Sequence, residues 1–201
     1  MSTATLREID PARLARLERA ADRQEILDCL IRFSRGIDRF DRDLLLSAFH
    51  PDAIDDHGEF VGTPEQLYDF ATGLHGLGQY CTHHNLLNHS CEIDGDIAHS
   101  ETYYLLTGRN RDDETIWIAQ GRYHDRLERR DGEWKIALRY CVVEWAGVLP
   151  ATNIPFADVP DVHANGVPQR GPEDVSYLRP LTNSRPMRCP ADLAALSGPR
   201  R

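Results

Sequence analysis

The feature that most constrains this chain is a change of periodicity near Tyr80. Before it, apolar residues recur at the spacing of one helix face; after it, apolar and polar residues alternate. Turn signals at Asp94-Gly95-Asp96 and Asp131-Gly132, with a polar run at 109–114, divide residues 80–145 into four long segments. This pattern predicts four antiparallel strands connected by tight turns.

The first third of the chain predicts helices. Apolar spacing indicates a helix over 14–37, and Asp41 can cap a short second one. Thr63-Pro64-Glu65-Gln66 has the N-cap, N1 proline and N3 glutamine of a capping box, and we expect the helix that follows to fray in the glycines of 73–78. Two short strands are expected around Gly58. Helices followed by long antiparallel strands predict an α+β fold with the helices on one face of the sheet.

Composition argues against several classes of function. A formal net charge of −9 disfavours a nucleic-acid binder, which needs a basic face. No stretch reaches the roughly 18 apolar residues of a membrane span, and the first residues lack the apolar segment of a signal peptide. Five separated cysteines without a CxxC pair fit reduced thiols. We therefore expect a cytoplasmic protein that contacts neither nucleic acid nor membrane.

The composition changes after Leu149. Most of the chain's 12 prolines follow this position, so no regular element is expected there. We divide the chain into a domain over 1–149 and a Pro-rich C-terminal tail over 150–201. The tail either drapes over the domain or a neighbouring subunit, or is disordered.

Asp38 is the first candidate functional residue. It continues a helical stripe through Leu27, Ile31 and Ser34, which directs its carboxylate toward the core. A buried carboxylate costs several kcal/mol unless it is paired or hydrogen-bonded, so a partner is expected. The alternative is that the helix ends earlier and Asp38 caps the next segment.

Two histidines lie early in the first long strand, within Cys81-Thr82-His83-His84-Asn85. Neighbours on a strand point to opposite faces, so one of His83 and His84 faces the core. An imidazole beside a buried carboxylate is held in one tautomer and becomes more basic, which is how a general base is built. A structural core histidine is the alternative. The spacing lacks a complementary carboxylate for a metal site, so no metal is expected.

Arg139 is the third candidate. Strand alternation places it on an apolar face together with Trp145. A guanidinium there requires an anion, either Asp38 or a negative charge that develops on a ligand; the alternative is an arginine at the rim that reaches solvent. Tyr104 and Tyr123 can add hydroxyl donors to a cavity.

Five short motifs within residues 20–147 form a recognisable set: Phe33-Ser-Arg-Gly-Ile-Asp38, Phe49-His-Pro-Asp-Ala53, Asp55-Asp-His-Gly58, Thr82-His-His84 and Glu128-Arg-Arg-Asp-Gly-Glu-Trp-Lys-Ile136. Together they resemble the signature of the SnoaL-like branch of the nuclear transport factor 2-like superfamily. The resemblance implies a cone-shaped α+β barrel in which helices pack on a curved, mostly antiparallel sheet around an apolar pocket. It also implies a homo-oligomer, a trimer or a dimer.

The resemblance also implies lyase chemistry. The branch includes dehydratases of scytalone and of bile acids, and a dehydrochlorinase of hexachlorocyclohexane. Asp38 matches their dyad aspartate and His84 their base, while Arg139 resembles the pocket arginine of the dehydrochlorinase. Phe33 stands where that enzyme has a catalytic lysine, which argues against dehydrohalogenation by the same constellation. Ketosteroid isomerases, polyketide cyclases and non-catalytic dioxygenase subunits share the fold.

We therefore expect a lyase that needs no cofactor and acts on a small apolar, ring-containing or aromatic molecule, releasing water or formaldehyde. His84 takes a proton, Asp38 orients it, Arg139 stabilises the developing charge, and His83 or Tyr123 serves as acid. An isomerase with the same base, or a ligand-binding protein without chemistry, is the alternative. The expected substrate-binding residues are His83, Tyr104, Tyr123, Phe33 and Trp145.

Overall fold

The computed structural model describes residues 10–112, 115–150, 164–183 and 185. Three helices precede the long strands, and capping explains where they begin. Asp41 accepts a hydrogen bond from the backbone N–H of Leu44 at 3.0 Å, and Thr63 and Gln66 form the expected capping box. The helices are α1 (Pro11–Arg39), α2 (Arg42–Leu46) and α3 (Pro64–Gly78). None of the described helices is long and apolar enough to cross a membrane.

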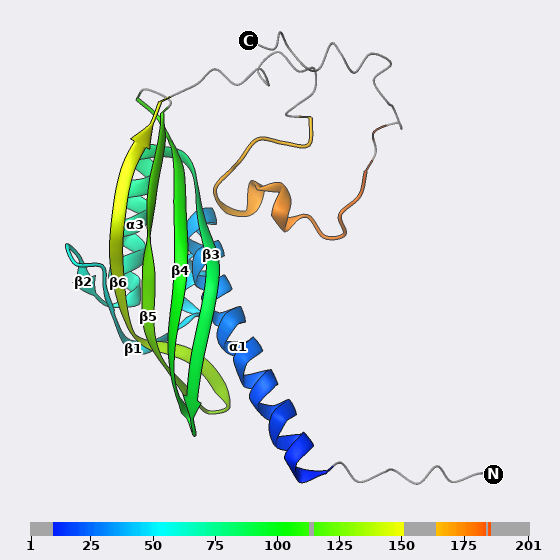
Figure 1. Ribbon diagram of the computed structural model, residues 1–201. Helices are drawn as coiled ribbons and strands as arrows, with labels where there is room; N and C mark the ends of the chain where they lie inside the picture. Colours follow the sequence, from blue (N-terminus) through cyan, green and yellow to red (C-terminus); the bar gives the residue numbers. More distant parts are fainter. Residues whose placement is uncertain (1–9, 113–114, 151–163, 184, 186–201) are drawn as a thin grey trace, which may run out of the picture.

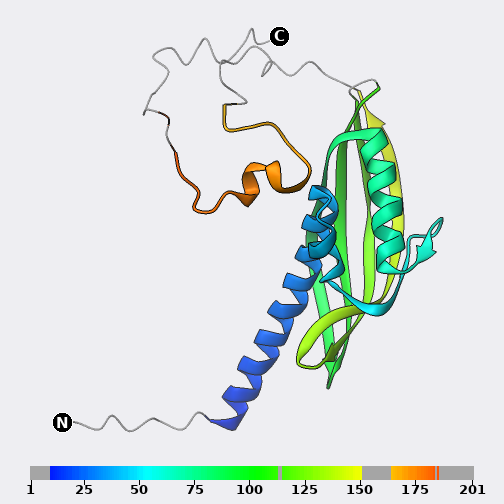
Figure 2. The same ribbon diagram turned by 180° about the vertical axis from the view of Figure 1, so that it is seen from behind.

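The strands form one six-stranded sheet in the order β2-β1-β6-β5-β4-β3. Neighbours are antiparallel except β1 and β6, which run parallel, so the sheet is mixed. It curves without closing, and α1 and α3 lie on the same face of it (Figures 1 and 2). This confirms the predicted α+β class and the four-stranded meander. The strands are β1 (Phe49–Asp56), β2 (Val61–Gly62), β3 (Gln79–Asp94), β4 (Ile97–Asn110), β5 (Ile116–Arg130) and β6 (Glu133–Leu149).

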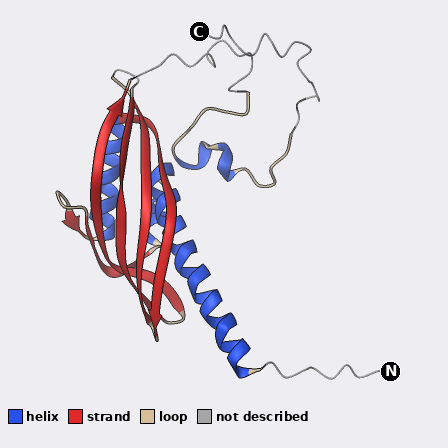
Figure 3. Ribbon diagram, viewed as in Figure 1, coloured by secondary structure: helices blue, strands red, loops and turns tan. Residues whose placement is uncertain are grey.

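Two helical expectations are wrong in detail. α3 continues through its glycines to Gly78 instead of fraying, because it packs on β1 and β3 and this packing offsets the weak helix propensity of glycine. On α1 the core face carries Ile26, Phe33 and Ile37, all fully buried, whereas Ile31 is 46% exposed. The stripe through Ile31 and Asp38 therefore lies at the edge of the core. Figure 3 shows how the helices cover one side of the strands.

A β-bulge in β6 changes which side chains face inward. Gly121 pairs with Val143 while Gln120 pairs with Trp145, so β6 carries an extra residue between these pairs. A Cβ atom at Gly121 would collide with a backbone carbonyl of β6, which explains the glycine at this close approach. The bulge shifts the alternation by one residue, so Trp145 lies on the outer face of the sheet.

The described part of the C-terminal segment, residues 164–183, lies beside the end of α1 (Figure 2). It contains two short 3-10 helices, η2 (Gly171–Glu173) and η3 (Val175–Tyr177). The Tyr177 hydroxyl donates to Asp41 at 2.7 Å, and Asp174 pairs with Arg39 at 3.4 Å. This segment therefore packs on the part of α1 that carries Asp38. The rest of the tail lies outside the described residues, and the division at 149/150 stays a prediction.

Candidate active site

A mostly apolar cavity of about 190 Å³ lies between the sheet and the two long helices. A cavity of about 150 Å³ is known to hold benzene, so this one has room for a small single-ring molecule. Its apolar wall comes from α1, α3 and the inner face of β4 to β6. The polar groups that line it are His57, His75, His84, Tyr104, Tyr123 and Cys141, with Glu59.

His84 and Asp38 meet at the wall of this cavity. The Asp38 carboxylate accepts two hydrogen bonds from His84: one from the ring Nδ1 at 2.7 Å and one from the backbone N–H at 2.9 Å. The two side chains are only 6% and 13% exposed, respectively. Because Nδ1 is engaged by a carboxylate, it carries the proton and leaves Nε2 as the basic atom. The pair has the geometry of a general base with its orienting group.

The Asp38 carboxylate stays ionised. Burial would raise its pKa, but hydrogen bonds from His84 and Thr82 outweigh this and lower the pKa below its ordinary value. The tail strengthens this arrangement, since Arg170 donates from one nitrogen to the Asp38 carbonyl at 2.7 Å and to the Thr82 hydroxyl at 2.9 Å. The Arg170 guanidinium also lies 4.1 Å from the centre of the Phe40 ring. Residues far apart in sequence therefore hold the carboxylate in place.

A second histidine, His75 on α3, stands next to His84. Their ring centres are 5.6 Å apart, and His75 Nδ1 hydrogen-bonds to Gln79 at 3.1 Å. Burial and the neighbouring His84 lower the pKa of His75 to about 4. His75 is therefore neutral near pH 7 and places no positive charge beside the proposed base.

A third histidine forms a pair of its own. His57 Nδ1 hydrogen-bonds to the carboxylate of Asp55, which is fully buried. Sequence reasoning quoted Asp55-Asp-His-Gly58 only as a family motif and missed this pair. The signal was present: Asp55 and His57 are two positions apart at the end of a strand, and such residues share a face.

Arg139 pairs with Asp125, and not with either partner expected for it, the Asp38 carboxylate or the developing charge of a ligand in the cavity. Its Nε and Nη2 donate to the two Asp125 oxygens at 2.7 and 3.0 Å, and both side chains are fully buried. The guanidinium lies against the rings of Phe33 and Tyr123, at 4.1 and 4.2 Å from their centres. Arg139 thus stands behind these rings and is not among the residues that line the cavity. The register of β5 and β6, which places Asp125 opposite Arg139, is the physical reason.

The other predicted substrate-binding residues divide into two groups. Phe33, Tyr104 and Tyr123 line the cavity. His83 and Trp145 are exposed and do not line it. His83 points away from His84 because strand neighbours alternate, and the bulge in β6 turns Trp145 outward.

A family model described as a SnoaL-like domain matches residues 18–140, more than half of the chain. The chain belongs to the SnoaL-like domain family. The predicted family and the nuclear transport factor 2-like fold are thereby confirmed. No curated protein sequence matches this SnoaL-like protein.

Solved structures similar to this SnoaL-like protein include two dehydrochlorinases and one candidate dehydratase. The hexachlorocyclohexane dehydrochlorinase LinA, type 2, has a TM-score of 0.63 at 23% identity, over 69% of this chain and 95% of that one. LinA-type3 from Novosphingobium barchaimii LL02 has a TM-score of 0.63 at 22% identity, over 69% of this chain and 97% of that one. A candidate scytalone dehydratase from Novosphingobium aromaticivorans DSM 12444 has a TM-score of 0.59 at 18% identity, over 67% of this chain and 91% of that one. At these identities the likeness shows a shared fold.

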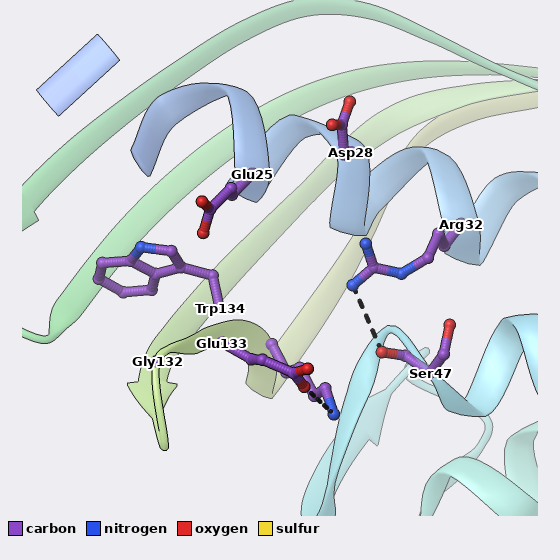
Figure 4. A pocket seen from close by; sticks show the side chains of 8 residues that line it. Glu25, Asp28, Arg32, Ser47, Gly132, Glu133 and Trp134 are labelled. Carbon is purple, nitrogen blue, oxygen red and sulfur yellow. Dashed lines mark hydrogen bonds and ion pairs between the residues drawn. The ribbon is translucent and has the colours of Figure 1, made fainter. Parts of the chain in front are cut away.

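A different depression of the SnoaL-like protein lies between α1 and the turn that joins β5 and β6 (Figure 4). Charged side chains such as Glu25, Asp28 and Arg32 line it, and Arg32 donates to the Ser47 carbonyl at 3.4 Å. Most of its lining residues are charged, unlike the predominantly apolar lining of a small-molecule site. Within the described ranges no group of three or more His, Cys, Asp or Glu side chains is placed to hold a metal ion.

Proposed function

We propose that this SnoaL-like protein is a lyase of the dehydratase type that needs no cofactor and acts on a small, mostly apolar molecule with a ring. The observation that carries the proposal is the Asp38–His84 pair at the wall of an apolar cavity. Burying a carboxylate against an imidazole costs desolvation energy, which a purely structural wall does not need. A base that must act near neutral pH needs this contact.

In this reaction His84 removes a proton from a substrate carbon. Asp38 keeps the Nδ1 proton in place and stabilises the imidazolium that forms, as a carboxylate does for the histidine of a catalytic triad. General base catalysis of this kind contributes roughly 10²–10⁴-fold to the rate. The electron pair of the broken C–H bond becomes a new double bond as the leaving group departs.

The cavity limits the substrate. Its volume of about 190 Å³ suits one substituted ring, and its wall of apolar and aromatic side chains favours an uncharged body. Tyr104 and Tyr123 stack on each other at 4.5 Å and bring hydroxyl groups to this wall. Arg139 acts behind the wall as a positioning residue for Phe33 and Tyr123. The similarity in fold to a dehydrochlorinase and a candidate scytalone dehydratase supports elimination chemistry.

A screen of cyclic and aryl-substituted alcohols, read by mass spectrometry, tests the proposal. Wild type is compared with His84→Ala and with His83→Ala, a matched control whose side chain is exposed on the opposite face of β3. Loss of water or formaldehyde by wild type and His83→Ala, but not by His84→Ala, supports the lyase. An unchanged mass with a shifted absorption spectrum indicates an isomerase. No turnover, with equal ligand binding by all three proteins, contradicts the base assignment and favours a ligand-binding protein.

A further inference from the structure

The base mechanism leaves one histidine–carboxylate pair of the cavity without a role. His57 lines the same cavity as His84, and its Nδ1 is held by Asp55. Aromatic rings connect the two histidines: Phe33 lies 6.4 Å from His84 and 5.6 Å from Tyr123, and Tyr123 lies 6.2 Å from His57, between ring centres. A ring bound against Phe33 and Tyr123 would therefore lie in a cavity whose wall contains both histidines.

The buried acidic and basic side chains behind His57 favour its protonated form. Asp55 and Asp125 both stand opposite Arg139 in the sheet register, one on β1 and the other on β5. All three side chains are at most 3% exposed. Two carboxylates and one guanidinium leave one negative charge uncompensated, and an uncompensated buried charge is strongly destabilising. A protonated His57 on Asp55 makes the row neutral.

The other groups around His57 agree with this assignment. Cys141 on β6 hydrogen-bonds to His57, and Tyr123 on β5 packs against the ring. Tyr104 on β4 reaches His57 only through Cys141, 3.6 Å from its hydroxyl, and Glu59 is exposed at the cavity rim. Burial would lower the pKa of His57, but the hydrogen bonds to Asp55 and Cys141 outweigh it and raise the pKa to about 10.

We propose that His57, positioned by Asp55, is the proton donor to the leaving group, and that the substrate is a ring-containing alcohol whose hydroxyl lies one carbon away from the acidic C–H. This inference rests on the proposed role of His84 as base. His84 Nε2 accepts the proton from carbon, and the C–H electron pair becomes the new C=C bond. The C–O electron pair leaves with oxygen, and the proton on His57 Nε2, the ring nitrogen that Asp55 does not hold, completes a water molecule. The step is redox-neutral, and solvent returns the proton from His84 to His57.

The presence of a donor selects among leaving groups. Hydroxide is a poor leaving group, because its conjugate acid, water, is a very weak acid, so its departure needs a proton from a more acidic group. Chloride leaves without one. A cavity lined by a cationic donor is therefore suited to the loss of water, and this separates the proposed reaction from dehydrochlorination.

The experiment compares two substrates that give the same product. One is the β-hydroxy ketone formed by aldol addition of acetone to benzaldehyde, and the other is its analogue with chloride in place of hydroxyl. Both yield benzylideneacetone, which is followed by its ultraviolet absorbance after subtraction of the spontaneous rate. We expect His57→Gln to lose roughly 10²–10⁴-fold in elimination of water while elimination of chloride changes less than about tenfold. His84→Ala is expected to lose both reactions.

Two further variants keep the test independent of folding. Asp55→Asn should lose water elimination selectively as well, because it releases His57 from its positioning residue. The double variant Asp55→Asn/His57→Gln removes both charges of the pair and leaves Arg139 balanced by Asp125, so it should fold even if the single variant does not. Loss of both reactions by the same factor in a folded His57 variant, or loss of neither, overturns the donor assignment.

Failure of the proposed function gives a different result. A wild-type protein that eliminates nothing from either ketone or from any alcohol of the screen contradicts the lyase proposal, and the donor is then judged by ¹⁵N NMR of the His57 ring, assigned with His57→Gln. An imidazolium at about pH 8, well above the ordinary histidine pKa of about 6.5, supports the donor assignment. A neutral ring at that pH overturns it.

Discussion

Asp38→Asn is the most informative single change, because it keeps the shape of the side chain and removes its charge. In the native protein the two Asp38 oxygens accept from His84 Nδ1 at 2.7 Å and from the His84 backbone N–H at 2.9 Å. The backbone N–H can only donate, so the asparagine oxygen must take that position. The amide nitrogen then faces Nδ1. An amide N–H needs an acceptor there, and the ring proton moves to Nε2.

The expected loss follows from this rearrangement. Nε2 now carries a proton and cannot accept one from substrate, and the imidazolium has lost a charged hydrogen bond worth about 1.5–3 kcal/mol. General base catalysis contributes roughly 10²–10⁴-fold, and the same substitution in a serine protease triad lowers kcat about 10⁴-fold. We therefore expect kcat to fall by roughly 10²–10⁴ with little change in KM.

The assay is the elimination rate on a substrate found in the alcohol screen, together with ¹⁵N NMR of the His84 ring. The control is Asp52→Asn, which neutralises a carboxylate on the surface that is 68% exposed. A kcat within about threefold of wild type, or an Nδ1–H tautomer that persists in Asp38→Asn, would refute the dyad.

Three further predictions concern stability. Asp125→Asn removes the carboxylate that pairs with the buried Arg139 and should lower the free energy of unfolding by about 3–5 kcal/mol, which is a fall in Tm of roughly 6–20 °C by calorimetry. Asp125→Leu/Arg139→Met should recover most of this loss. A fall in Tm below about 2 °C for Asp125→Asn contradicts the pair. His75 is held below its ordinary pKa of 6.5, at about 4, so the unfolded state binds more protons between these values. The free energy of unfolding should therefore fall as the pH drops from 6.5 toward 4, and urea midpoints of His75→Leu should show less of this decline; an identical slope contradicts it. Arg170→Met should lower the free energy of unfolding by roughly 1–3 kcal/mol. The matched control Arg179→Met, whose hydrogen bonds to described residues are to the carbonyls of Ser176 and Leu178 in its own segment, should stay within about 0.5 kcal/mol; equal losses contradict the anchoring role of Arg170.

Part of the site was accessible from sequence because its signals are local. Asp38 lies on a helix near its end, and helical periodicity directed it toward the interior, whereas strand alternation required only that one of His83 and His84 face the core. Buried polarity predicted that the Asp38 carboxylate needs a donor, and the family resemblance, not the periodicity, pointed to His84. The exposed Ile31 shows the limit of inference from periodicity, because one hydrophobic pattern is compatible with two core-facing stripes that differ by one position along the helix.

The rest of the site depends on register. Whether Arg139 meets Asp38 or Asp125 is decided by how β5 pairs with β6, and whether Trp145 faces in or out is decided by one extra residue in β6. Neither the strand pairing nor the bulge has a strong local sequence signature. Gly121 is a local sign of the bulge, but the need for a glycine is seen in the structure, where the Val142 carbonyl occupies the space of a Cβ atom.

By itself the sequence determined the helices and strands, because capping residues, Asp-Gly turns and hydrophobic periodicity act between residues that are close in the chain. It also indicated that the Asp38 carboxylate would need a partner in the interior, and the family resemblance named His84 as that partner. Only the tertiary structure decided which charges share the interior: the Asp55–Arg139–Asp125 row and the protonated His57 that balances it come from three strands and the end of one of them. The physical reason is that burial removes water from these groups, so each must find its counter-charge among residues that the fold, rather than the chain, makes its neighbours.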